Sequence, residues 1–179
     1  MKKDILYIAV KVGLVLGGIV AASAFIHSAL RHNLYASLIP LWVVYLFATV
    51  FCYLWAYSLA NKKENQVNFI SAILLVAIIA TIAALINGLE AYAFTQFYDT
   101  NYLSEMMSEA KENWKQYNYT EASIQTQWEQ TLYKDPFNHG FETFKTMFIF
   151  NSVLGSFAFV MYFIRWMLKK PKKRAKRKI

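Results

Sequence analysis

Long apolar stretches separated by short polar ones dominate this chain. A helix crosses the hydrocarbon core of a bilayer with roughly 20 mostly apolar residues. Four stretches reach this length: residues 5–26, 38–60, 69–94 and 146–168. Their only charged residues are Lys11, Glu90 and Arg165. Each stretch is too long and too apolar for a buried helix of a soluble domain, so the pattern predicts an all-α membrane protein with four transmembrane helices.

The segment between the third and fourth stretches, residues 95–143, has the periodicity of amphipathic helices. Apolar residues recur at three- and four-residue steps over 103–117 and again over 124–132. Thr120 is a candidate cap for the second helix, Asp135 and Pro136 are expected to end it, and Gly140 is expected to add a break. We predict an extracytoplasmic helical hairpin. It either covers span ends and lipid headgroups or binds a partner or ligand.

Lysine and arginine set the expected orientation. Lys2 and Lys3 precede the first span, Lys62 and Lys63 separate the second from the third, and a basic tail, residues 169–179, follows the fourth. Four crossings place all of these on one side. The other side receives Arg31 and the segment 95–143, which has eight acids and three lysines. The positive-inside rule then predicts cytoplasmic termini and one four-span domain, residues 1–168, before the tail.

Composition agrees with a membrane location. Hydrophobic residues make up 57% of the chain and charged residues 17%, which excludes a disordered chain and makes a soluble fold unlikely. The net charge is +8, and eight basic residues lie in the tail, so the rest of the chain is neutral. We interpret Lys11 and the tail as topology signals or contacts with anionic lipid headgroups. No nucleic-acid-reading module accompanies the tail, so nucleic acid is not an expected partner. The tail's basic residues are Lys169, Lys170, Lys172, Lys173, Arg174, Lys176, Arg177 and Lys178.

The first span has a second interpretation. Lys2 and Lys3 precede an apolar run, and Ala22-Ser23-Ala24 resembles a signal-peptidase site. The run is long for a signal peptide and further spans follow, so an uncleaved helix is favoured. Aromatic residues near the predicted span ends, including Trp42, Trp55, Tyr57 and Tyr92, suit the membrane interface.

Polar residues near the outer ends of the spans form the main candidate site. Asn87 and Glu90 share a helical face, and the others are expected at a similar depth. Such a cluster is either a small vestibule or ion site, or a set of hydrogen bonds between helices, and packing is the favoured interpretation. Lys11 is likewise a topology anchor or, less favoured, a functional group. The candidate cluster consists of His27, Asn87, Glu90, Glu142, Lys145 and Asn151.

Known catalytic and metal motifs are missing from the sequence. His27 and His32 are five residues apart, and no cysteine assists them or His139 in a metal-binding pattern. The chain has no glycine-rich phosphate loop and no nucleophile elbow. The single cysteine, Cys52, lies in an apolar run and suits packing. We therefore expect no metal, no cofactor and no enzymatic activity.

Small residues at four-residue spacing predict how the spans pack. They allow helix backbones to approach closely. The set consists of Gly13, Gly17 and Ala21 on the first span, Ala80, Ala84 and Gly88 on the third, and Gly155 on the fourth. The second span lacks such a row. We therefore expect a bundle of spans one, three and four, with span two more exposed to lipid. Whether one small face also forms a dimer stays open.

The whole layout resembles the small bacterial membrane proteins of domain-of-unknown-function family 4199. The shared features are a basic start with Lys11-Val12-Gly13, a short turn at Lys62-Lys63, and a third span that ends in aromatic residues. An acidic insert of about fifty residues then closes on the run 133–137, before a last span with a basic end. The resemblance implies a four-helix protein of the bacterial inner membrane and supplies no catalytic residues.

Three function classes follow from these observations. The favoured one is a non-enzymatic accessory, scaffold or assembly subunit that binds another membrane protein. The alternative is a small homo-oligomeric transporter or channel, because four spans are few for a transport path within one chain. A membrane enzyme is the third class and would need a titrating group in the outer polar cluster.

Overall fold

The computed structural model describes residues 3–30, 41–64, 67–105 and 135–169, and between them only 108, 111–112, 120 and 122–123. Its long helices are α1 (Lys3–Leu30), α2 (Leu41–Glu64), α3 (Phe69–Ala93) and α6 (Pro136–Lys169), and α3 continues into a π-helical turn, η1 (Phe94–Tyr98). The described residues contain no strand. Four helices are long and apolar enough to cross a membrane, which confirms the prediction of an all-α fold with four candidate membrane spans.

Side-chain caps fix where two of the helices begin. Asn68 precedes α3, and its side chain accepts a hydrogen bond from the Ser71 amide at 2.7 Å. Asp135 precedes α6, and its carboxylate accepts bonds from the amide and the side chain of Asn138 at 2.9 and 2.7 Å. Both residues satisfy amides of a first turn that have no partner within the helix.

The start of α6 differs from the prediction. The helix begins at Pro136, well before residue 146, and Gly140 lies inside it. Proline suits the first helical position, where its missing N–H has no intrahelical partner to lose. Asp135 and Pro136 therefore start a helix, and the predicted break at Gly140 was wrong. Most of the predicted hairpin lies outside the described residues, although Thr120 Oγ1 accepts a bond from the Ser123 amide at 3.3 Å, as a cap does.

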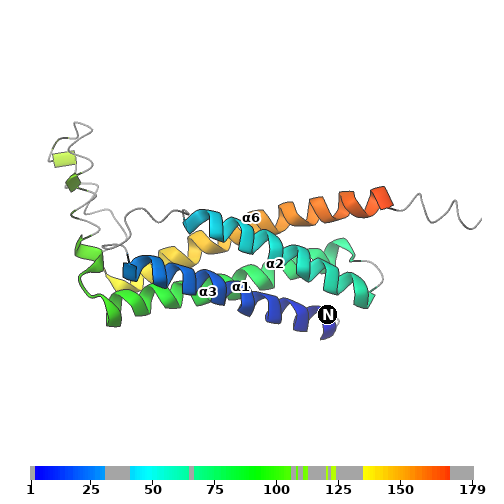
Figure 1. Ribbon diagram of the computed structural model, residues 1–179, viewed down its shortest axis with the longest axis horizontal. Helices are drawn as coiled ribbons and strands as arrows, with labels where there is room; N and C mark the ends of the chain where they lie inside the picture. Colours follow the sequence, from blue (N-terminus) through cyan, green and yellow to red (C-terminus); the bar gives the residue numbers. More distant parts are fainter. Residues whose placement is uncertain are drawn as a thin grey trace, which may run out of the picture.

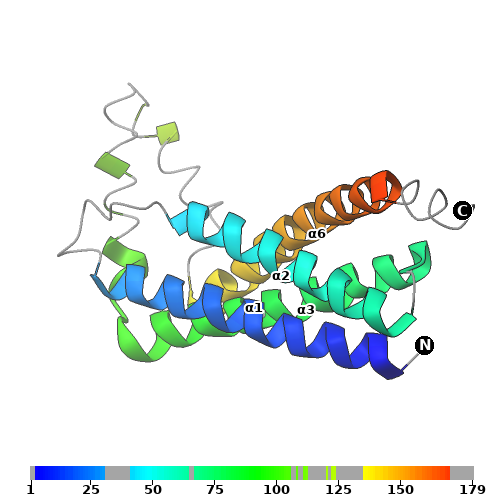
Figure 2. The same ribbon diagram turned by 45° about the vertical axis from the view of Figure 1, so that its right-hand side comes forward.

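The helices form an antiparallel bundle in which α1 and α3 run in the same direction. Helix α3 packs along α1 on one side and α6 on the other, and α2 also packs on α1 and α6. The backbones of the consecutive helices α2 and α3 make few close contacts and lie across the bundle from each other. Figures 1 and 2 show that the start of α1 and the end of α6 lie at the same end of the bundle.

Small residues lie at the α1–α3 contact. A Cβ atom added at Gly13 would lie 2.9 Å from Ile82 Cβ, and one added at Gly17 would lie 2.6 Å from Ile86 Cδ1. Ala21, Ala80 and Ala84 are also buried. Gly13 and Gly17 let the backbones of α1 and α3 approach closely, whereas Ala80 and Ala84 share the helix face of Gly88, which contacts α6.

Helix α2 is more buried than its lack of small residues suggested. In its most apolar window 39% of residues are buried, as in α3, whereas the value for α6 is 17%. Tyr53 and Tyr57 are fully buried, so Tyr57 is a core residue and not the interface residue that we expected. The prediction that span two is the more lipid-exposed one was wrong, because its tyrosines point inward and α6 has the exposed face.

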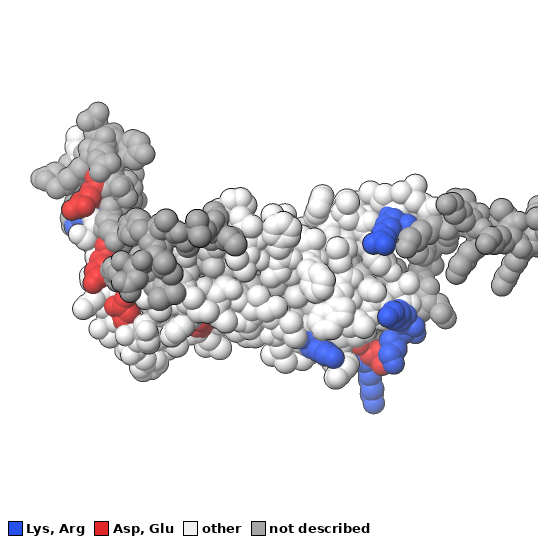
Figure 3. Space-filling view, in the orientation of Figure 1, with Lys and Arg blue, Asp and Glu red and all other residues white. Residues whose placement is uncertain are grey.

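Charged residues divide the bundle into two ends. Figure 3 shows blue side chains at one end and most of the red ones at the other. We call the first the basic end, with Lys3, Lys62, Lys63 and Arg165, and the second the acidic end, with Asp99, Glu105 and Asp135. Residues 170–179 of the basic tail lie outside the described residues, as does the side chain of Trp166.

Candidate functional site

The polar residues expected to form one outer cluster lie at different places. Glu142 and Lys145 form an ion pair within α6. His27 is exposed on α1, and Glu90 is partly buried on α3. Asn87 is fully buried but donates to the carbonyl of Ala83 in its own helix, at 2.7 Å. The structure thus brings only Glu142 and Lys145 together by a direct contact among these residues.

Asn151 lies at another depth. Gly88 and Gly140 are in contact, which puts Asn87 near the level of Gly140. Asn151 is eleven residues further along α6, or roughly 16 Å at 1.5 Å per residue. There Asn151 Oδ1 accepts a hydrogen bond from Thr49 Oγ1 of α2 at 3.2 Å. Asn151 therefore joins α6 to α2 deep in the bundle.

A row of polar side chains on α2 is a feature that the sequence analysis missed. The row is Tyr45, Thr49, Tyr53, Tyr57 and Asn61. The first four are buried, and Asn61 is partly buried. Spacing by four residues puts all five on one helix face. This regular spacing was the available signal, but tyrosine counts as apolar and hid it among the hydrophobic residues.

The hydroxyl groups of this row hold α2 to its neighbours. Tyr53 donates to the carbonyl of Val76 in α3 at 3.3 Å, and Tyr57 donates to the carbonyl of Gly155 in α6 at 3.0 Å. A Cβ atom at Gly155 would lie 2.6 Å from Tyr53 Cζ, so this glycine gives the ring its space. The two tyrosine hydroxyls thus donate to backbone oxygens, and the hydroxyl of Thr49 donates to the side chain of Asn151. The row therefore serves packing and does not form a chain of hydroxyls along the bundle.

Helices α3 and α6 are in close backbone contact at a pair of glycines near the acidic end. A Cβ atom at Gly88 would lie 2.8 Å from the carbonyl oxygen of Gly140, and one at Gly140 would lie 2.7 Å from that of Gly88. Neither position has room for a side chain. The crossing depends on a residue, Gly140, that the sequence analysis assigned to a break.

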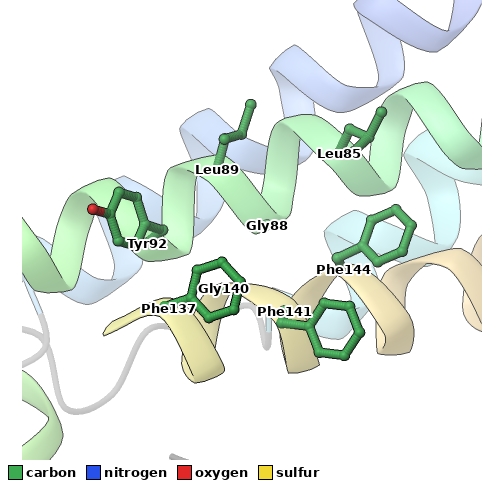
Figure 4. A pocket seen from close by; sticks show the side chains of 8 residues that line it. All are labelled: Leu85, Gly88, Leu89, Tyr92, Phe137, Gly140, Phe141 and Phe144. Atoms are coloured by element: carbon green, nitrogen blue, oxygen red, sulfur yellow. The ribbon is translucent and has the colours of Figure 1, made fainter. Parts of the chain in front are cut away.

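Beside this crossing lies an apolar hollow of about 390 Å³. In Figure 4 the two glycines lie where the ribbons meet, with α6 phenylalanines on one side and α3 side chains on the other. Lys145 Nζ lies 5.2 Å from the centre of the Phe141 ring, so its ion pair with Glu142 is next to the hollow. The lining residues are Leu85, Gly88, Leu89, Tyr92, Phe137, Gly140, Phe141 and Phe144.

A second hollow of about 400 Å³ lies between the same helices nearer the basic end. We call the two hollows together the α3–α6 groove. Apart from two serines, the second hollow is apolar. It is lined by Phe69, Ala72, Ile73, Val76, Ala77, Phe148, Ser152, Ser156, Phe159 and Val160.

The groove is suited to apolar contacts. Its walls are aromatic and aliphatic side chains, which bind apolar side chains or hydrocarbon and do not orient a polar substrate. In the described part of the chain, no three His, Cys, Asp or Glu side chains gather where they could hold a metal ion. Cys52 is buried in the core.

Comparison with known proteins gives one match. The family described as Protein of unknown function (DUF4199) matches residues 11–168, which is most of the chain. The curated proteins and the solved structures give no match.

Proposed function

This chain belongs to the DUF4199 family, and from the geometry of its α3–α6 groove we propose that it is a non-enzymatic accessory subunit of the bacterial inner membrane. In this role it acts as a scaffold or assembly component that holds a membrane helix of another protein. The two ends of opposite charge support a location with both termini in the cytoplasm.

The observation that carries the proposal is the exposed face of α6 together with the groove. α6 is the least buried of the four helices, and Phe137 and Phe141 are 70% and 50% exposed beside the first hollow. The ion pair of Glu142 and Lys145 lies on the same helix, and charged groups in a membrane helix favour contact with protein or water over hydrocarbon. A partner helix would cover both features.

The length of the groove favours a helix as the occupant. From Gly88 to Val76 of α3 is twelve residues, roughly 18 Å along the axis. The two hollows therefore lie in opposite halves of a hydrocarbon core about 30 Å thick. One acyl chain stays within one half, whereas one helix passes both hollows. A different protein fits better than a second copy, because a two-fold axis through the groove would place hollow against hollow and leave both unfilled.

The test is photo-cross-linking from the groove in native membranes. A photoreactive phenylalanine analogue replaces Phe141 in one variant and Phe51, which is 71% exposed on α2, in the control. After extraction in a mild detergent, the mass of the intact complex is measured. We expect one further polypeptide in fixed ratio, cross-linked from position 141 and not from position 51.

A filling variant makes this test specific. Ala77 lines the second hollow, so Ala77→Phe should displace the partner while the bundle still folds. The control, Ile19→Phe, changes a residue that is 42% exposed on α1 and should keep the partner. Cross-links only between copies of this chain would favour the homo-oligomeric transporter or channel instead. Cross-links only to lipid would overturn the proposal.

A further inference from the structure

A lysine, Lys11, lies within the membrane-spanning part of α1. Lys11 is exposed, and its Nζ lies 5.9 Å from the ring centre of Trp55 on α2. Among the residues that the structure describes, no carboxylate forms an ion pair with it. A cation at such a position is stabilised by the ring only in part, and an anion is the natural further partner.

The side chain of Lys11 extends toward the basic end. Gly13 is level with Ile79 and Ile82 of α3, whereas Tyr53 reaches the carbonyl of Val76. Trp55 follows Tyr53 in the direction of the basic end, so it lies nearer that end than the backbone of Lys11 does. A lysine that reaches from the hydrocarbon toward the headgroups has this geometry.

Two more residues with hydrogen-bond donors lie on the same face of α1 as Lys11, nearer the basic end. Lys3, Tyr7 and Lys11 are spaced by four residues, which lines them up along α1. Lys3 is exposed, and Tyr7 is 68% exposed. Two ammonium groups and a phenol hydroxyl therefore lie in one row over the last two turns before the basic end.

Below Lys11 the same face is apolar. Leu14 and Val15 are 55% and 39% exposed, and Phe51 on the neighbouring α2 is 71% exposed. Gly18 follows one turn further and has no atom within 4 Å of an added Cβ, which leaves a notch. An apolar track thus continues from the donors toward the middle of the bundle.

We propose that Tyr7 and Lys11, with Trp55 beside them, bind the phosphate of an acidic phospholipid whose acyl chain lies along the α1–α2 seam, and that Lys3 adds positive charge nearer the basic end. Ammonium groups and a hydroxyl donate hydrogen bonds to phosphate oxygens, and tryptophan is enriched at the depth of the membrane–water interface. An acidic lipid is favoured because its net charge complements two lysines. This site lies on other helix faces than the α3–α6 groove and does not depend on the proposed partner.

The test is lipid binding to the purified full chain, followed by native mass spectrometry. The probes are phosphatidylglycerol and phosphatidylcholine with the same acyl chains. Lys11→Met keeps most of the length of the unbranched side chain and removes its charge. We expect about fivefold weaker binding of phosphatidylglycerol. Lys63→Gln removes an exposed charge at the same end, away from Trp55, and should change binding by less than about twofold.

Two further measurements separate the outcomes. Lys11→Arg should restore binding, and thermal unfolding should show that all variants fold. Glycerol phosphate, a soluble phosphate ester without acyl chains, should not displace phosphatidylglycerol. Equal binding of the two lipids, or unchanged binding by Lys11→Met, would overturn the proposal. Displacement by glycerol phosphate would show that a soluble phosphate ester is bound, and the acyl-chain track would then be wrong.

Discussion

At the scale of single residues, buried polar side chains are the features that distinguish this bundle from a purely apolar one. Thr49 and Asn151 meet across α2 and α6, and both are almost completely buried. In hydrocarbon an unpaired polar group is unfavourable, so this contact fixes how α6 is rotated against α2. Tyr57, about two turns further along α2, fixes the same pair of helices through Gly155, which is one turn beyond Asn151 on α6.

We predict that Thr49 and Asn151 are energetically coupled. Thr49→Val and Asn151→Leu should each lower the free energy of unfolding in detergent, and the double variant should lose less than the sum. The coupling should be about 0.6 kcal/mol, the usual size for such bonds in membranes. Ser156→Ala is the control, because Ser156 is exposed and bonds only to Ser152 of its own helix. Strictly additive losses would show that the contact contributes nothing.

At the scale of helices, glycine decides how closely α3 and α6 approach. The two backbones meet at Gly88 and Gly140, and the first hollow lies directly beside this crossing. The contact between Gly88 and Gly140 therefore sets the position of both walls of the groove. A single added methyl group at this contact would push the two helices apart.

Gly140→Ala should destabilise the protein by about 1–3 kcal/mol, the usual range for an overpacked contact. Its Cβ would lie 2.7 Å from the Gly88 oxygen and 2.9 Å from Tyr92 Cβ. Gly18→Ala is the matched control, because nothing lies within 4 Å of its added Cβ and alanine is the better helix former. The midpoint of thermal unfolding should fall for the first and hold or rise for the second. A stable Gly140→Ala protein would mean that the helices cross elsewhere.

The sequence predicted the existence of the helices better than their ends and contacts. Runs of apolar residues determine which segments cross a membrane, and all four are found. The start of α6 was misplaced because Pro136 and Gly140 break helices in one context, yet here they start one and allow close packing. The groove was beyond prediction, since its walls come from residues roughly 45 to 90 positions apart that meet only through the packing of α3 on α6.

At the scale of the whole molecule, the separation of charge along the bundle axis sets how it sits in a membrane. The basic end carries Lys62 and Lys63 between two spans, and the acidic end carries the carboxylates that follow η1. Lysine and arginine resist translocation across the inner membrane, whereas acidic residues have little influence. The basic end should therefore face the cytoplasm, and the phospholipid site proposed at Lys11 would then lie in the cytoplasmic leaflet.

Thiol labelling tests this orientation directly, because the protein's single cysteine, Cys52, is buried. Thr100→Cys and Lys63→Cys each place one exposed thiol, at the acidic and the basic end. A membrane-impermeant maleimide should label Thr100→Cys in intact spheroplasts and Lys63→Cys only after lysis. The unchanged chain is the background control. Labelling of Lys63→Cys in intact spheroplasts would show the opposite orientation, in which the basic end faces the periplasm against the positive-inside rule.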